Sequence, residues 1–357
     1  MNALTQQIRF CTSADGTRIA YALSGQGPPL VLSANWLTHL EYQWRHLTWR
    51  PWLETLSGNQ TVLRYDQRGC GLSDWNIPDP TFEGWLGDFE TVVEAAKLDR
   101  FPIIGVCQGG PVAIEYAARH PERVSHLVLF GSFVRGRLKR GNDPQVIEDA
   151  KVKYDLARLG WATETHVYMH AFATLWQPGA STEHLRSWCE LQRVTTSPEN
   201  AVRHMRLANS IDVSESARHV QCPTLVIHAN RDRVVPIEEG RICAGLIPNS
   251  RFVQLESENH LLLEDEPAWA RMLEALNAFL PAHQDARRQG PFALLSKRET
   301  DVLELIARGK DNAQIAACLD LSGKTVRNYI TCVFAKLEVE NRSQAIVLAR
   351  EAGFGGK

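Results

Sequence analysis

The sequence contains no apolar run that approaches the roughly 18 residues a membrane-spanning helix needs. Its first residues, MNALTQQ, have neither the basic start nor the apolar core of a signal peptide. We therefore expect a soluble, cytoplasmic protein with no membrane partner.

Paired cysteines are also absent. The 8 cysteines lie singly along the chain and form no CxxC pair. Zinc sites and disulfide frameworks depend on regularly spaced cysteines, so this pattern argues against both and fits a reducing cytosol. We expect neither a metal nor another cofactor.

A large net charge is missing as well. The formal net charge of −2 excludes a protein that holds nucleic acid by bulk charge alone. This total hides an asymmetry: residues 281–357 carry 12 Lys and Arg against 9 Asp and Glu (+3), and residues 1–280 carry 27 against 32 (−5). A mildly basic tail on an acidic body permits a local DNA-binding module.

The composition, with 44% hydrophobic and 22% charged residues, is typical of a globular protein. A length of 357 residues suggests two domains, at roughly 100–200 residues for each domain. In the first part of the chain, short β-branched apolar runs alternate with helical patterns. This alternation predicts a parallel sheet with crossover helices, which is an α/β fold. The expected strands cover 9–11, 18–23, 30–32, 61–65, 103–106, 124–130, 224–227 and 251–255, and the expected helices 109–120, 238–246 and 267–280.

Residues from about 133 to 216 interrupt the alternation with several helices rich in large aromatic side chains. Helices inserted into an α/β fold usually cover the pocket at the carboxyl ends of the strands, so we expect a helical cap. Whether these aromatics line a ligand pocket or only hold the cap to the body stays open, because aromatics dominate core burial anyway. The pocket candidates are Trp161, Tyr168, Phe172 and Trp176.

A polar segment bounded by prolines, residues 281–291, is typical of a linker. It separates an expected first domain, residues 1–280, from a second and purely helical domain, residues 292–357.

The segment GVCQGG, residues 105–110, lies between an expected strand and an expected helix. A side chain held in a strained turn at such a junction projects above the edge of the sheet. The strand and the helix pass so closely there that only glycine fits two residues before and two residues after it. The pattern G-x-[SC]-x-G arises by chance in about one chain in ten of this length, so its context carries the prediction. That context favours Cys107 as a nucleophile.

Two later loops supply the partners such a nucleophile needs. Asp232 follows the strand at 224–227, and His260 follows the strand at 251–255. The chain order nucleophile, acid, histidine is that of α/β hydrolases. Together with DQRGCGLSD at 66–74, these motifs resemble the α/β-hydrolase family over residues 8–280. The resemblance implies that His260 takes the proton of the Cys107 thiol while Asp232 holds the imidazole and stabilises the imidazolium.

The resemblance also implies an oxyanion hole made by the N–H groups of Gln108 and Trp36. Two positions depart from the family pattern: the nucleophile is Cys where most members have Ser, and Ala34-Asn35 precede Trp36 where many have His-Gly. The dienelactone hydrolase branch also has Cys here, and a thiolate acylates readily, yet Cys in a Ser site often leaves a slow or stalled acyl-enzyme. A slow hydrolase, a covalent sensor and a pocket without covalent chemistry all stay open.

The C-terminal residues predict four helices. Ser296 and Glu299 have the spacing of a capping box at the start of the first helix, and Asp311 caps the second. A short turn at 320–323 leads into a third helix, which runs to Leu337, and a fourth covers about 343–352. Two helices joined by a tight turn, the second with a cationic and polar face, form a helix-turn-helix.

This segment resembles the LuxR-type DNA-binding domain over residues 292–354, through LSKRETDVLELIARG, NAQIAACLDLSGKTVRNYI and AKLEVENRSQA. The resemblance implies that the third helix enters the major groove of double-stranded DNA. Arginine and asparagine side chains can form hydrogen bonds with base edges, and lysine and threonine side chains can bind phosphates. These preferences leave open which residue contacts which base. Low net charge predicts modest affinity for one monomer, so we expect a homodimer on an operator with two half-sites. The residues implied in DNA contact are Lys324, Thr325, Arg327, Asn328, Tyr329 and Lys336.

Two functions follow from these motifs. The first is a DNA-binding transcriptional regulator whose hydrolase-like domain binds a small carbonyl-containing ligand. The alternative is an active ester, lactone or thioester hydrolase with a tail that targets it to DNA. We favour the regulator because the C-terminal motif is nearly whole, whereas the hydrolase motif departs at two positions.

Overall fold

The computed structural model describes residues 5–161, 167–280 and 290–355. The chain divides into two compact units, the first holding most of residues 1–279 and the second holding residues 280–357 together with Gly25–Pro28 and Gly58–Thr61. Apart from its last two residues, the predicted linker lies outside the described residues. In the described part of the chain, no helix is long and apolar enough to cross a membrane.

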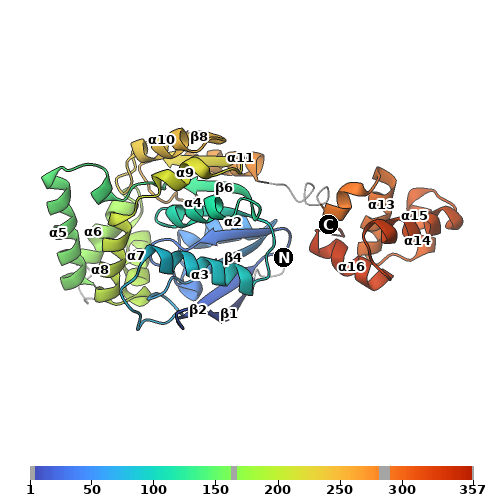
Figure 1. Ribbon diagram of the computed structural model, residues 1–357, viewed down its shortest axis with the longest axis horizontal. Helices are drawn as coiled ribbons and strands as arrows, with labels where there is room; N and C mark the ends of the chain where they lie inside the picture. Colours follow the sequence, from blue (N-terminus) through green and yellow to red (C-terminus); the bar gives the residue numbers. More distant parts are fainter. Residues whose placement is uncertain (1–4, 162–166, 281–289, 356–357) are drawn as a thin grey trace. The chain divides into compact units, whose positions relative to one another are not determined.

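The first unit is built on one eight-stranded sheet with the order β1-β2-β4-β3-β5-β6-β7-β8 (Figure 1). The pairs β1–β2 and β2–β4 are antiparallel, whereas β3–β5, β5–β6, β6–β7 and β7–β8 are parallel, so the predicted α/β class is confirmed. The strands are β1 (Gln6–Thr12), β2 (Arg18–Ser24), β3 (Pro29–Ser33), β4 (Thr61–Tyr65), β5 (Phe101–Val106), β6 (Val124–Phe130), β7 (Thr224–Ala229) and β8 (Ser250–Leu255).

Helices cover both faces of this sheet. On one face, Leu129 of β6 belongs to a large buried cluster that also takes side chains from α3, α4, α9 and α10. Its neighbour Phe130 points to the other face, as alternation along a strand requires, and packs on Trp52 of α2, which in turn packs on Trp269 of α11. The helices are α1 (Leu40–Gln43), α2 (Trp49–Ser57), α3 (Phe82–Ala95), α4 (Gly109–Arg119), α9 (Ser214–His219), α10 (Ile237–Leu246) and α11 (Pro267–Phe279).

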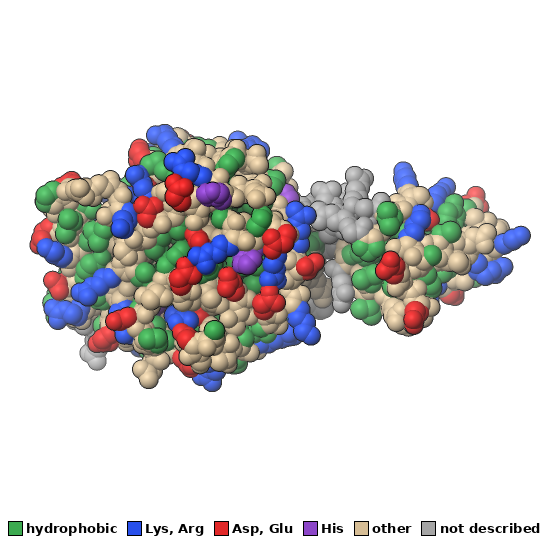
Figure 2. All heavy atoms as spheres, viewed as in Figure 1, with side chains coloured by type: hydrophobic (Ala, Val, Ile, Leu, Met, Phe, Trp, Pro, Cys, Tyr) green, Lys and Arg blue, Asp and Glu red, His purple; other side chains and the backbone are tan. Residues whose placement is uncertain are grey.

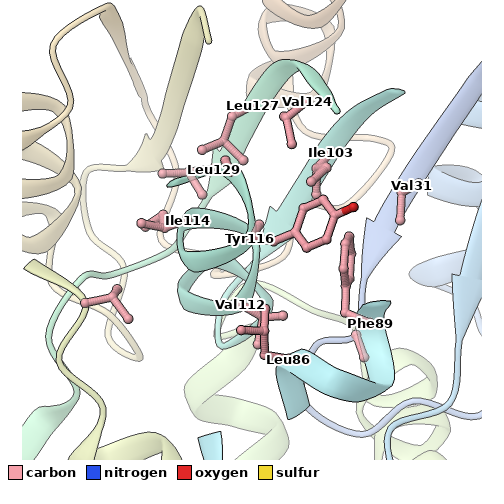
Figure 3. Packing of buried hydrophobic residues seen from close by; sticks show 14 of the residues in the cluster. Val31, Leu86, Phe89, Ile103, Val112, Ile114, Tyr116, Val124, Leu127 and Leu129 are labelled. Carbon is pink, nitrogen blue, oxygen red and sulfur yellow. The ribbon is translucent and has the colours of Figure 1, made fainter. Parts of the chain in front are cut away.

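The large cluster fixes α4, the helix that follows Cys107, on the sheet. Figure 3 shows Tyr116 of α4 beside Phe89 of α3, with ring centroids 4.7 Å apart, and close to Ile103 of β5. All three side chains are buried. Burying a large side chain stabilises a fold by roughly 1.5–3 kcal/mol, so this packing holds α4 in a defined place on the sheet.

The segment predicted as a cap is helical where it is described. It lies between β6 and β7 and projects from one end of the sheet (Figure 1). Ser181 and Ser197 cap two of its helices with their side-chain oxygens. The cap elements before α9 are η1 (Arg137–Lys139), α5 (Pro144–Gly160), α6 (Val167–Trp176), α7 (Thr182–Thr195) and α8 (Pro198–Ser210).

The second unit consists of η2 (Gly290–Leu294), α13 (Lys297–Ala307), α14 (Asn312–Leu319), α15 (Gly323–Lys336) and α16 (Arg342–Glu351). Ser296 and Glu299 form the predicted capping box, and Gly309 follows α13 with a φ of 76°. Two small cores hold the helices together: one includes Leu303 and Val333, and the other Ile306 and Val326.

Candidate functional site

Cys107 occupies the sharp turn between β5 and α4. Its φ is 50°, in the left-handed region that non-glycine residues rarely adopt. The Cys107 N–H donates to the carbonyl of Phe130 at 3.0 Å, and the Cys107 carbonyl accepts from the hydroxyl of Ser132, also at 3.0 Å. These bonds hold the strained backbone in place at the predicted strand–turn–helix elbow.

The surrounding glycines allow strand and helix to pass this closely. A Cβ on Gly105 would lie 2.6 Å from the Cα of Gly110, and a Cβ on Gly109 would lie 2.9 Å from the carbonyl oxygens of Ser33 and Ala34. Real Cβ atoms do not approach other atoms so closely, so the two glycine positions are dictated by packing.

Asp232 and His260 meet at the carboxyl ends of β7 and β8. His260 Nδ1 lies 2.6 Å from Asp232 Oδ2, and both side chains are fully buried. The other carboxylate oxygen of Asp232 accepts the N–H groups of Val234 at 2.8 Å and Val235 at 3.0 Å. The loop after β7 therefore fixes the carboxylate, and the carboxylate fixes the orientation of the ring.

The charges of this group favour a protonated imidazole. Burial by itself lowers the pKa of His260, but the Asp232 carboxylate and the Cys107 sulfur outweigh burial and raise that pKa well above its usual value. His260 in turn holds the pKa of Asp232 below its usual range, against the effect of burial. His228, the last but one residue of β7, has its pKa lowered by burial and bonds through Nε2 to the carbonyl of Val235 at 2.8 Å, which is a structural role.

The second nitrogen of the His260 ring is directed toward the sulfur by this arrangement. His260 Nε2 makes no well-formed hydrogen bond within the described residues, while Cys107 contributes to the raised pKa of the ring. Catalytic hydrogen bonds are often long before substrate binds. The geometry thus suits transfer of the thiol proton to His260.

Cys107 opens into a cavity of about 130 Å³. Trp36 and Gln108, the two predicted oxyanion-hole residues, line the same cavity and are themselves buried. The Gln108 side chain donates to the side-chain oxygen of Gln67 at 3.0 Å.

The four aromatic pocket candidates take different places. Phe172 and Trp176 line the cavity, and the Trp176 ring packs edge-on against His260 with centroids 4.6 Å apart. Trp161 is not among the lining residues; it packs against Trp36 and Phe172 and donates its indole N–H to Thr196. Tyr168 is also outside the lining, and its side chain is 39% exposed.

Sequence reasoning missed four cations in the cavity lining: Arg137, Arg140, Lys153 and Arg233. They come from η1 and the residue after it, from α5 and from the loop after β7. No motif connects such distant positions, and only the three-dimensional placement of the cap brings them together.

In the second unit, one face of α15 is exposed. Lys324, Arg327, Asn328 and Thr331 follow one another at helical spacing, and all four are exposed to solvent. Figure 2 shows Lys and Arg side chains projecting from the end of this unit where α14 and α15 lie.

The other predicted DNA contacts have partners inside the unit. Thr325 bonds to the Ser322 hydroxyl at 2.8 Å, and Tyr329 packs on the core that contains Ile306. Lys336 Nζ lies 2.7 Å from a carboxylate oxygen of Glu299, the capping-box residue. This bond favours an internal role for Lys336 over a phosphate contact.

The sheet, the elbow and the buried acid–histidine pair define a hydrolase-type fold, and the comparisons with known families agree. The alpha/beta hydrolase fold family matches residues 36–168 and 163–267, and the chain belongs to that family. The family of bacterial regulatory proteins called luxR matches residues 293–349, so the second unit is a LuxR-type DNA-binding domain.

Among curated proteins, the chain is 26% identical over 250 residues to pyrrolizixenacetamide deacetylase of Xenorhabdus hominickii, covering 70% of this chain and 90% of that protein. It is 25% identical over 273 residues to non-heme chloroperoxidase CPO-A1 of Kitasatospora aureofaciens, covering 70% and 91%. Among solved structures, the enol-lactonase from Burkholderia xenovorans LB400 aligns with a TM-score of 0.61 and 25% identity over 76% of this chain and 99% of that one.

Proposed function

We propose that this chain is a transcriptional regulator. Its first unit binds a small carbonyl-containing ligand at Cys107, and its second unit binds DNA with an affinity that depends on that ligand. One observation supports this most strongly. A strained cysteine beside a buried acid–histidine pair faces a cavity, on the same chain as a LuxR-type DNA-binding domain.

The chemistry proposed for the first unit is acyl transfer. His260 takes the thiol proton, and the Cys107 sulfur attacks the carbonyl carbon of an ester or lactone. The oxygen that becomes negative is held by the N–H groups of Gln108 and Trp36. The imidazolium then protonates the departing alkoxide, which leaves an acyl group on Cys107 until water removes it.

The response to ligand requires two states of the protein that differ in ligand affinity. A homodimer that places two α15 helices on two half-sites supplies such states, because ligand binding can bias either dimerisation or the placement of the helices. Activity on DNA also fits a cytoplasmic location.

The alternative is an active hydrolase with a DNA-targeting tail. It is supported by the relatives, whose names include a deacetylase and an enol-lactonase. The two functions differ in the lifetime of the acyl group: a regulator retains it or binds without it, whereas an enzyme releases it many times.

Intact mass spectrometry of the full chain with activated acyl esters and lactones tests the proposal, beside Cys107→Ala. We expect a mass increase in the wild type alone, together with a changed affinity for DNA selected by the protein from random duplexes. Many turnovers per chain without any change in DNA affinity would favour the enzyme. A DNA affinity that is the same with and without every compound of the panel would contradict the regulator.

A further inference from the structure

The cavity beside Cys107 has walls of two kinds. Trp36, Phe172 and Trp176 supply apolar surface near the sulfur, whereas Arg137, Arg140 and Lys153 supply positive charge from the cap. No aspartate or glutamate is among the lining residues described. A cavity of about 150 Å³ holds a benzene ring, so a cavity of about 130 Å³ suits a ligand of similar size.

The carboxylates that pair with these cations are fewer than the cations. Asp149 is shared, since its Oδ2 lies 2.5 Å from Arg137 and 2.9 Å from Lys153. Glu239 is shared as well, at 2.8 Å from Arg135 and 3.8 Å from Arg140.

The fourth lining cation, Arg233, pairs with Glu258 at 3.3 Å. Counting Arg135, which shares Glu239 with Arg140, five cations thus pair with three carboxylates, so the cations outnumber the carboxylates that pair with them.

Arg140 is the least exposed of the four lining cations, since its side chain is 18% exposed against 24% for Arg137 and Lys153 and 60% for Arg233. Its Nε donates to the carbonyl of Arg135 at 3.0 Å, and its guanidinium lies 5.6 Å from the centre of the Phe133 ring. For its two terminal NH₂ groups the described residues provide no hydrogen bond, although the side chain is only 18% exposed. Burial lowers the pKa of this guanidinium while Glu239 acts to raise it, so a second anion in the cavity would relieve a desolvated charge.

We propose that the ligand of Cys107 is an anionic acyl compound: an ester, lactone or thioester whose acyl part carries a carboxylate that binds Arg140. A guanidinium offers two parallel donors that match a carboxylate. When the carboxylate binds Arg140, the carbonyl carbon of the ligand can lie at the Cys107 sulfur and its apolar part can pack on the aromatic side chains. This inference rests on the proposed function for the cavity and adds the chemical class of its ligand.

The test separates charge preference from covalent chemistry. In the full-length Cys107→Ala protein, binding of monomethyl glutarate and of methyl pentanoate is measured by calorimetry. Both probes have a five-carbon acyl chain, and only the first ends in a carboxylate. We expect the anion to bind roughly ten- to a hundredfold more tightly, which is the range for a hydrogen bond to a charged group.

Adding Arg140→Gln to the same protein is expected to abolish most of this preference. The matched control is Arg158→Gln, which removes an exposed arginine of α5 that pairs with Asp155. The control is expected to keep the preference. Equal binding of the two probes, no binding of the anion up to about 10 mM, or a preference that survives Arg140→Gln would overturn the inference.

The covalent role is followed separately in the wild type, with the p-nitrophenyl esters of glutarate and pentanoate. An acylation rate faster for the glutarate ester, and confined to Cys107, supports both proposals. Retained binding preference in Cys107→Ala without any acylation of the wild type would remove the covalent step and leave the anionic ligand class standing.

Discussion

His260 Nδ1 and Asp232 Oδ2 lie 2.6 Å apart in a place that water does not reach. A carboxylate this close to a buried imidazole selects the tautomer with the proton on Nδ1 and stabilises the imidazolium. In the proposed reaction it therefore decides which ring nitrogen accepts the thiol proton of Cys107.

We expect Asp232→Asn to slow the reaction of Cys107 with iodoacetamide by about a hundredfold or more at pH 7, because an amide neither stabilises the imidazolium nor selects the right tautomer. The same change in a serine triad costs about 10⁴ in rate. Peptide mass mapping measures the alkylation of residue 107 apart from that of the exposed Cys318 and Cys332.

Asp265→Asn is the control, since it removes an exposed carboxylate five residues beyond His260. It is expected to leave the rate at Cys107 unchanged. An Asp232→Asn protein that reacts as fast as the wild type would show that Asp232 does not govern the histidine.

A second buried carboxylate predicts a pH-dependent stability. Asp66 is fully buried and accepts the N–H of Leu72 at 2.8 Å, and its burial raises its pKa to about 7, against the effect of nearby Arg64. An acid whose folded pKa exceeds its unfolded value of about 3.9 loses stability as pH rises between those two values. We expect the stability of Asp66→Asn relative to wild type to increase by up to a few kcal/mol from pH 5 to pH 8, measured by urea denaturation.

Asp99→Asn, a change at an exposed aspartate, is the control for this series. Its stability relative to wild type is expected to vary little over the same pH range. A relative stability of Asp66→Asn that is flat from pH 5 to pH 8 would contradict the raised pKa of Asp66.

The sequence predicts some parts of the first unit and not others. The elements around Cys107, Asp232 and His260 follow from local signals, because each lies at the end of a short apolar strand with its own turn chemistry. The start of β5 was predicted two residues late. Phe101 already pairs with Val124 and a register shift follows at Pro102, which cannot donate to a ladder.

The four cations of the cavity had no such signal. Arg137 and Arg233 are almost a hundred residues apart in the chain, and each would suit an ordinary solvated surface. Their common position depends on how the cap packs on the sheet, which no local pattern encodes. The same holds for Lys336, whose bond to Glu299 joins the end of α15 to the start of α13.

Two glycine substitutions, one at the elbow and one in α3, are expected to change the free energy of unfolding in opposite directions. In Gly105→Ala the new Cβ would lie 2.6 Å from backbone at Gly110, so we expect a loss of at least about 2 kcal/mol in the free energy of unfolding. Gly87→Ala lies in α3 with nothing within 4 Å of the new atom, and we expect a gain of about 0.5–1 kcal/mol. Urea denaturation followed by circular dichroism measures both, and equal effects would mean that close packing does not dictate Gly105.

The exposed face of α15 carries the last prediction. We expect Arg327→Ala to weaken binding to the preferred DNA by roughly 1–3 kcal/mol, because arginine paired with a base edge contributes about that much discrimination. The measurement is fluorescence anisotropy of the full chain on duplexes that the wild type has selected from random sequences.

The matched control is Arg298→Ala, which removes the same charge from an exposed position in the first turn of α13. Loss of bulk charge alone would weaken both variants alike and would lower their affinity for selected and unselected DNA by the same factor. Loss of a base contact instead lowers only the affinity of Arg327→Ala for selected DNA, and so reduces its ratio of specific to non-specific binding. An unchanged ratio in Arg327→Ala would therefore mean that this face of α15 does not recognise bases through Arg327.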